Sequence, residues 1–274
     1  SLLKIGTRGS PLALAQAIET RTRLMNFWNL PEKAYEIIVV QTSGDRIQDR
    51  SLRSVGGKGL FVSEIEDKLL DGSIDIAVHS MKDVPTVQPD SLLLDTYLPR
   101  EDVRDAFISN TAKTISDLPK GCTVGTSSLR RRAQVLNIRP DLEVVEFRGN
   151  VQTRLRKLSD GDANCTFLAM AGLNRLNKPN IATIAIEPSF MLPAVAQGAI
   201  GIERRKGDKV AAKFLEPLHD LETGHRLSAE RTFLAELDGS CQTPIAGLAV
   251  ITGSELLLQG EVLRPDGSEK LTGE

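Results

Sequence analysis

Short apolar runs rich in β-branched residues alternate with amphipathic stretches along this chain. Strands are expected at Leu2–Gly6 and Tyr35–Gln41, and the segment between them places Leu14, Ile18 and Met25 on one helical face. Strands separated by helices in this order are typical of α/β proteins with largely parallel sheets. The pattern therefore predicts an α/β fold.

The junction between the first strand and its helix is built from small residues. Ser10 can cap the helix, with Pro11 at the first helical position. The free backbone N–H groups of the helix then face the same place as Arg8, which favours an anion site. An ordinary capped helix with a solvated arginine is the alternative when this junction is taken alone.

A second round of strand, small-residue turn and helix begins at Cys122–Gly125, and Ser128 opens its helix. Ligands in open α/β sheets bind beyond the carboxyl ends of the strands, so two such junctions predict two lobes with a cleft between them. The other expected elements are helices at Phe61–Leu70, from Asn150, at Val210–Leu215 and at Leu227–Leu237, strands at Ile74–Val78, Leu142–Phe147, Thr166–Met170, Ala246–Ile251 and Glu255–Leu263, and a return crossing at Pro188–Gly201.

The length and composition agree with a globular protein of several domains. At roughly 150 residues per domain, 274 residues suggest about two domains and room for a small third. No apolar run approaches the roughly 18 residues of a membrane span. Three widely spaced cysteines and three histidines favour neither a disulfide framework nor a zinc site, so no metal is expected.

The net charge of −2 hides a basic segment. Residues 130–157 carry eight lysines and arginines against three carboxylates, and the chain has 21 arginines to 13 lysines. Since the arginine fork grips carboxylate or phosphate at two points, a polyanion is the first partner to consider. Nucleic acid is the rival partner, but aromatic residues make up only 4% of the chain, which is a poor supply for base stacking.

The glycine-rich run at residues 56–59 is not a phosphate-binding loop. Arg53 stands where that motif needs glycine, and Gly59 stands where it needs serine or threonine. What the run predicts is a glycine loop that carries one cation, Lys58, and a plain surface loop is the alternative.

An acid and a base, Asp83 and Lys82, follow a strand that is expected to be buried. A local ion pair or a turn cap would explain them without function. A carboxylate held among cations in a cleft would instead stabilise positive charge that develops on a substrate.

Arg148 and Arg154 place cations at a strand end and one turn into the next helix, with surface salt bridges as the alternative. Cys241 lies in a glycine-containing turn. From the residues alone, its default role is that of a small hydrophobe, and a nucleophile is the alternative.

Six segments occur in order along the chain: VGGKGLF (55–61), DIAVHSMKDVP (75–85), GTSSLRR (125–131), RGNVQTRL (148–155), LPAVAQGAIGIE (192–203) and GSCQTPI (239–245). Together they resemble the porphobilinogen deaminase (hydroxymethylbilane synthase) family of tetrapyrrole biosynthesis, from Ile5 to about Ala249. Several long motifs in one order make this resemblance far more specific than a single short motif.

The resemblance implies a role for each matching residue. Cys241 would carry a dipyrromethane cofactor through a thioether, Asp83 would be the catalytic aspartate, and Lys58 would belong to a loop over the cleft. The residues implied to hold the carboxylates of substrate and cofactor are Arg8, Ser10, Lys82, Ser128, Arg130, Arg131, Arg148, Arg154 and Arg175.

The implied activity is that of a transferase. It polymerises four porphobilinogen molecules head to tail onto the dipyrromethane primer, releases ammonia, and frees linear hydroxymethylbilane by hydrolysis. Asp83 would stabilise the pyrrole N–H cations formed on the way. Each ring brings an acetate and a propionate, so an arginine-lined cleft suits the growing chain.

The resemblance also implies an architecture. Residues 1–98 with 199–216 and residues 99–198 would form two lobes like those of type II periplasmic binding proteins, and residues 217–274 a small α+β domain that carries the cofactor. Family members usually extend beyond Glu274, so this third domain is expected to be incomplete.

The expected partner is porphobilinogen, without nucleic acid or membrane. We expect a monomer in the cytoplasm, with the plastid stroma as the alternative if a transit peptide has been removed. Two other functions stay open on the residues alone. A two-lobed binding protein for a polycarboxylate would leave Cys241 unmodified, and an RNA or polyanion binder would lose affinity steeply with salt.

Overall fold

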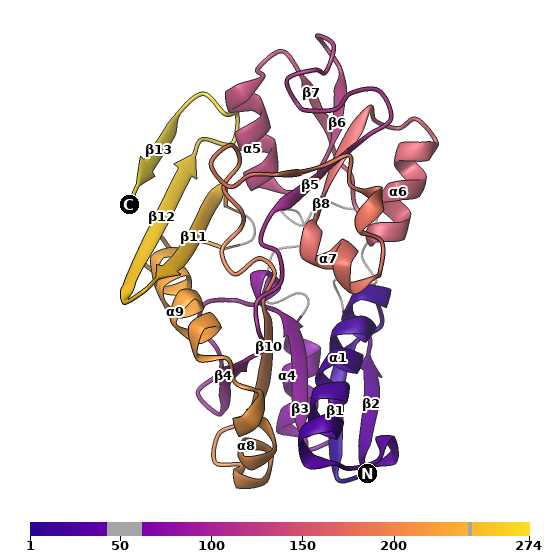
Figure 1. Ribbon diagram of the computed structural model, residues 1–274, viewed down its shortest axis with the longest axis vertical. Helices are drawn as coiled ribbons and strands as arrows, with labels where there is room; N and C mark the ends of the chain where they lie inside the picture. Colours follow the sequence, from indigo (N-terminus) through magenta and orange to yellow (C-terminus); the bar gives the residue numbers. More distant parts are fainter. Residues whose placement is uncertain (43–61, 241–242) are drawn as a thin grey trace. The chain divides into compact units, whose positions relative to one another are not determined.

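The computed structural model describes residues 1–42, 62–240 and 243–274. These residues form two compact units (Figure 1). Unit 1 contains Ser1–Glu101 and Ala199–Ser228, and unit 2 contains Asp102–Gly198 and Ala229–Glu274. The expected division into three domains stays a prediction.

Unit 1 is built on a five-stranded sheet in which four strands run the same way. Its order is β2 (Tyr35–Val40), β1 (Leu3–Arg8), β3 (Ile76–Ser80), β10 (Ile200–Arg205) and β4 (Leu92–Tyr97). β1 is parallel to β2 and β3, whereas β10 is antiparallel to both of its neighbours. The largely parallel sheet that the sequence predicts is therefore interrupted by one reversed strand.

Unit 2 repeats this arrangement. Its sheet has the order β7 (Glu143–Val145), β6 (Thr123–Gly125), β8 (Cys165–Ala169), β5 (Asp105–Ser109) and β9 (Ile184–Ile186). β6 is parallel to β7 and β8, and β5 is the reversed strand in the fourth place. The predicted second round of strand, turn and helix is confirmed, and so is the α/β class.

Helices connect the strands of both sheets. Unit 1 contains α1 (Pro11–Trp28), α4 (Ser63–Leu70) and α8 (Lys209–Leu215), unit 2 contains α5 (Leu129–Ile138), α6 (Val151–Ser159) and α7 (Met170–Arg175), and α9 (Leu221–Glu236) continues from unit 1 into unit 2. Among the described residues, no helix is long and apolar enough to cross a membrane.

The predicted face of α1 is wrong. Leu14 and Met25 are only partly buried and Ile18 is 45% exposed. The helix packs against β1 and β3 through a face on which two alanines and a threonine alternate with larger residues. The buried positions are Ala13, Gln16, Ala17, Thr20 and Leu24.

A three-stranded antiparallel sheet follows α9 in unit 2, formed by β11 (Ile245–Thr252), β12 (Glu255–Leu263) and β13 (Lys270–Gly273). α5 holds this sheet through side-chain hydrogen bonds. Gln134 Nε2 donates to Glu261 Oε1 at 2.8 Å, and Asn137 Nδ2 donates to the Gly267 carbonyl at 2.9 Å. The sequence did not predict β13, nor did it predict β4, β5, β9 or β10 as strands.

Candidate active site

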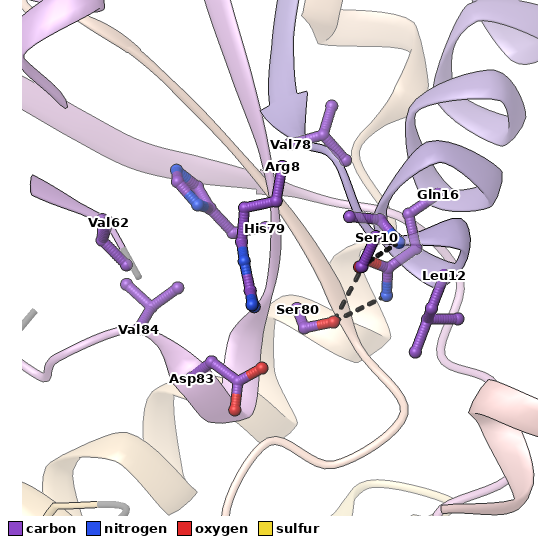
Figure 2. Close-up of a pocket in the computed structure, with 11 residues that line it drawn as sticks. Arg8, Ser10, Leu12, Gln16, Val62, Val78, His79, Ser80, Asp83 and Val84 are labelled. Carbon is purple, nitrogen blue, oxygen red and sulfur yellow. Dashed lines mark hydrogen bonds between the residues drawn. The ribbon is translucent and has the colours of Figure 1, made fainter. Parts of the chain in front are cut away.

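A pocket in unit 1 opens at the carboxyl ends of β1 and β3 (Figure 2). Arg8 ends β1, and Asp83 ends the short 3₁₀ turn Met81–Asp83 that follows β3. Because these strands are parallel neighbours, residues 75 positions apart meet at one sheet edge. The polar residues that line the pocket are Arg8, Ser10, Gln16, His79, Ser80 and Asp83.

The side chains of this pocket have a defined arrangement. In Figure 2 the Arg8 guanidinium extends toward the Asp83 carboxylate. Gln16 Nε2 lies 2.8 Å from Ser80 Oγ and ties α1 to the end of β3. Sequence reasoning missed Gln16, although it lies on the helical face that continues from the Ser10 cap.

The junction before α1 folds as predicted. Ser10 is the N-cap, and its hydroxyl accepts a hydrogen bond from Ala13 N at 3.2 Å. Pro11 occupies the first helical position. The cap satisfies one backbone donor and leaves the start of the helix facing the pocket.

The turn that carries Lys82 and Asp83 is held by β10. Met81 N donates to the Ala199 carbonyl at 3.1 Å, and Val84 N donates to the Met81 carbonyl at 3.3 Å. A side chain at Gly201 would collide with the Met81 sulfur, so glycine is required there. Both Lys82 and Asp83 are half-buried.

A histidine that lines the pocket forms a buried pair with a glutamate. His79 Nε2 and Glu203 Oε2 lie 2.9 Å apart, and both side chains are almost fully buried. Sequence reasoning singled out neither residue for chemistry. A lone histidine in a strand gives no local sign of a carboxylate that lies 124 positions away.

The corresponding edge of unit 2 holds two buried arginines. Ser128 caps α5 and accepts a hydrogen bond from Arg131 N at 3.4 Å. Arg130 Nη1 and Arg131 Nη2 each lie 2.7 Å from a carboxylate oxygen of Asp105, whose side chain is fully buried. In the structure both arginines pair with Asp105, a partner that the sequence did not indicate, and their predicted role toward ligand carboxylates stays a prediction.

The two guanidinium groups control the ionisation of Asp105. Burial alone would raise the pKa of this carboxyl group. The charges and hydrogen bonds of Arg130 and Arg131 outweigh burial and hold the pKa of Asp105 well below its ordinary value. Asp105 is therefore a carboxylate at neutral pH, and it fixes both arginines in place.

The other predicted cations of unit 2 lie at strand and helix ends. Arg148 Nη1 is buried and has no hydrogen-bond partner among the described residues. Arg154 Nε donates to the Gly149 carbonyl at 2.9 Å, and Arg175 Nη2 donates to the Gly198 carbonyl at 3.1 Å. The unsatisfied donor of Arg148 is the kind of group that an incoming carboxylate satisfies.

Two predicted residues, Lys58 and Cys241, lie outside the described residues. Within the described ranges, no group of three or more His, Cys, Asp and Glu side chains is placed to hold a metal ion.

Comparison with known proteins gives matches over nearly the whole chain. The family model "Porphobilinogen deaminase, dipyromethane cofactor binding domain" matches residues 3–213, and "Porphobilinogen deaminase, C-terminal domain" matches residues 225–274. A porphobilinogen deaminase of Paracoccus denitrificans is 62% identical over 272 residues, which are 99% of this chain and 87% of that protein. One of Nitrobacter winogradskyi is 56% identical over 268 residues, 98% of this chain and 85% of that protein.

Solved structures of binding proteins also resemble the chain. The methionine-binding protein MetQ matches with 12% identity and a TM-score of 0.49, covering 86% of this chain and 94% of MetQ. A periplasmic substrate-binding protein of an ABC transporter from Coxiella burnetii matches with 14% identity and a TM-score of 0.48. The match covers 85% of this chain and 97% of the Coxiella protein.

Proposed function

The chain belongs to the porphobilinogen deaminase family, and on that premise we propose that Asp83 is its catalytic carboxylate and Cys241 the attachment point of its cofactor. The family fixes the reaction: a transferase polymerises porphobilinogen into hydroxymethylbilane, with dipyrromethane as cofactor. The alternative of a non-catalytic binding protein is not favoured. The observation that carries the assignment of Asp83 is its place beside Arg8 in the unit 1 pocket.

Asp83 suits the stabilisation of a cation. Loss of ammonia from porphobilinogen leaves positive charge on the pyrrole ring and its N–H group. A half-buried carboxylate at the pocket wall stabilises that charge more strongly than water does, because it is already oriented. Arg8, which extends toward Asp83 in Figure 2, is a guanidinium of the kind that can hold a substrate carboxylate beside Asp83.

The residues of unit 2 fit a cofactor that carries carboxylates. The buried Arg148 Nη1 without a partner among the described residues is a ready donor for an acetate or propionate group. We assign Ser128, Arg130, Arg131, Arg154 and Arg175 to the same task, and Ser10 and Lys82 to carboxylates in unit 1. When bound, the dipyrromethane supplies the primer to which porphobilinogen units are joined.

Three further properties are proposed from the family. The division into residues 1–98 with 199–216, 99–198 and 217–274 would separate two lobes from a cofactor-carrying domain. The enzyme would act as a monomer in the cytoplasm, and Lys58 would lie in a loop over the site. Light scattering of the purified holoenzyme tests the monomer, because a dimer would double the measured mass.

The proposed attachment is tested by intact mass. The purified protein and its Cys241→Ser variant should differ by two linked porphobilinogen-derived rings, beyond the change of one side-chain atom. An unmodified parent is then supplied with porphobilinogen or hydroxymethylbilane. If it still gains no mass, Cys241 is not the attachment point and the binding-protein alternative returns.

Replacement of Arg148 by glutamine should weaken loading of the primer. The change removes a half-buried cation whose buried Nη1 has no partner among the described residues. A charge-assisted contact to a carboxylate is worth roughly 1.5–3 kcal/mol, or about tenfold to a hundredfold in the affinity that holds the primer before its attachment. Cofactor content is measured by intact mass after reconstitution at limiting porphobilinogen.

The matched control for Arg148 is Arg156→Gln, since Arg156 is exposed on α6. It should load the primer like the parent. Equal loading of the Arg148 variant and the parent would remove Arg148 from the cofactor site.

A further inference from the structure

A buried imidazole–carboxylate pair in unit 1 has no part in the function described so far. His79 Nε2 and Glu203 Oε2 are 2.9 Å apart, and their side chains are 4% and 0% exposed. Antiparallel β3 and β10 bring them together, and Gly201 lies opposite His79 in the register.

A buried ion pair is weak evidence for a stabilising role. Burial of a charged pair costs desolvation energy, and hydrophobic residues of similar size often stabilise a core equally well. The cost is greater here because Glu203 Oε1 is buried with no hydrogen-bond partner among the described residues. A buried titratable pair in the wall of a pocket is therefore a candidate for a chemical role.

The hydrogen bond determines which imidazole nitrogen can accept a proton. A carboxylate oxygen only accepts, so the Glu203 carboxylate takes the Nε2–H and leaves the lone pair of the neutral ring on Nδ1. Within the described part of the chain Nδ1 has no hydrogen-bond partner, and His79 lines the same pocket as Asp83. Nδ1 is thus the basic atom of the pair.

The charged groups around His79 come from four elements. Glu203 lies on β10, Glu66 lies on α4, and Arg8 and Asp83 line the pocket from the end of β1 and the turn after β3. Glu66 interacts electrostatically with both members of the pair, and its pKa is raised first by burial and then by the charge of Glu203. The imidazole therefore shares this region with the carboxylates of Glu203, Glu66 and Asp83 and with the Arg8 guanidinium.

Each addition of porphobilinogen needs a base. The C–N bond of the substrate breaks and its electron pair leaves with ammonia, while a C–C bond forms at a ring carbon that carries a hydrogen. That hydrogen must leave as a proton, and its electron pair returns to the ring. No separate acid is required, because an alkyl amine with an ordinary pKa of about 10 is already protonated at neutral pH.

We propose that His79 Nδ1 accepts this proton and that Glu203 is the positioning residue that orients the ring and stabilises its cation. The imidazolium then passes the proton to ammonia, which departs as ammonium and restores the neutral ring. The proposal rests on the proposed function, in which Asp83 stabilises positive charge. In this scheme the Asp83 carboxylate stabilises the substrate cation, and the His79 imidazole accepts the proton that leaves the ring carbon.

The test compares His79→Gln and Glu203→Gln holoenzymes on porphobilinogen that carries deuterium at its free α-carbon. Loss of a general base should lower turnover by about a hundredfold or more in His79→Gln, and by less in Glu203→Gln. Both variants should show a larger deuterium isotope effect than the parent, because proton removal becomes the slow step. A purely structural defect that displaces the Met81–Asp83 turn would slow all steps equally and would leave the isotope effect at the parent value.

Glu230→Gln is the matched control. Glu230 is also a fully buried carboxylate, but it accepts hydrogen bonds from Ala196 N and Ala249 N in unit 2. Its replacement should leave the isotope effect at the parent value, even if the protein is less stable.

A second readout does not depend on turnover. The chain has three histidines, so a protein labelled with ¹⁵N-histidine gives few signals. In the parent, the neutral ring of His79 should hold its proton on Nε2 and leave Nδ1 unprotonated. Glu203→Gln should disturb this tautomer preference and leave the signals of His219 and His225 unchanged.

Two results would overturn the proposal: turnover of folded His79→Gln at the parent rate, or slow turnover of both variants with the parent isotope effect. A proton on Nδ1 in the parent spectrum would also overturn it. Failure of the proposed function would give other results. Asp83→Asn would then turn over porphobilinogen at the parent rate, or the parent would carry no dipyrromethane.

Discussion

Asp83→Asn should reduce turnover of porphobilinogen by at least about a hundredfold while the protein stays folded. Removal of one oriented group that stabilises charge in a transition state costs about 10²–10³ in rate. Asparagine keeps the size of the side chain and removes its negative charge, so the loss reports the charge itself. Turnover is measured on holoenzyme whose intact mass shows the attached primer.

Asp90→Asn is the control for this charge change. Asp90 lies in the exposed segment between the Met81–Asp83 turn and β4, so its replacement should leave turnover unchanged. If Asp83→Asn carries the primer and still works at the parent rate, Asp83 does not stabilise the cation. Loss of the primer from Asp83→Asn would instead place this residue in cofactor assembly, which single-turnover addition to a preloaded protein distinguishes.

Asp105→Asn should lower the free energy of unfolding of unit 2 by about 3–5 kcal/mol. The change leaves Arg130 and Arg131 buried without the carboxylate that both of them contact at 2.7 Å. Urea unfolding followed by circular dichroism measures the loss. Trp28, the single tryptophan of the chain, lies in unit 1, so its fluorescence serves as an internal reference.

The pH dependence of this effect has a definite sign. The pKa of Asp105 is lower in the folded protein than its ordinary value, so its stabilising contribution is complete above about pH 3.9 and is lost as the pH falls below that value. The Asn variant should lack this part of the acid sensitivity. Exposed Asp162→Asn is the control and should unfold like the parent. Equal stability of Asp105→Asn and the parent would show that the arginines find other partners.

Arg130 and Arg131 are poor targets for a direct test of carboxylate binding. Their replacement would leave Asp105 buried and unpaired, so a loss of cofactor would follow from unfolding as readily as from a lost contact. Arg148, whose Nη1 has no internal partner among the described residues, gives the cleaner result.

Local features of the chain were predictable from the sequence alone. The caps Ser10, Ser128 and Asn150 begin α1, α5 and α6 where their residue types predict, and each accepts a hydrogen bond from the backbone three residues on. Capping depends on neighbours within one turn, so the sequence contains all the information it needs. The family was also readable from the sequence, because its motifs are long and occur in order.

Periodicity was a weaker guide to burial. The large residues of α1 suggested one face, and the helix buries another that combines small and polar residues with Leu24. Which face of α1 is buried depends on how the sheet packs against the helix, and the sequence of the helix alone does not contain that information. The same limit applies to β10, because a reversed strand is defined by its partners β3 and β4 and not by its own pattern.

For the chemistry of the site too, the sequence and the tertiary structure determined different things. The sequence determined which residue types are present: an aspartate after a strand, arginines at helix starts, and a histidine within a motif. Tertiary structure decided their partners, since it placed Asp105 on two arginines and Glu203 on His79 across 124 positions. Buried charges require compensation from whatever lies nearest in space, and only the folded chain determines which groups those are.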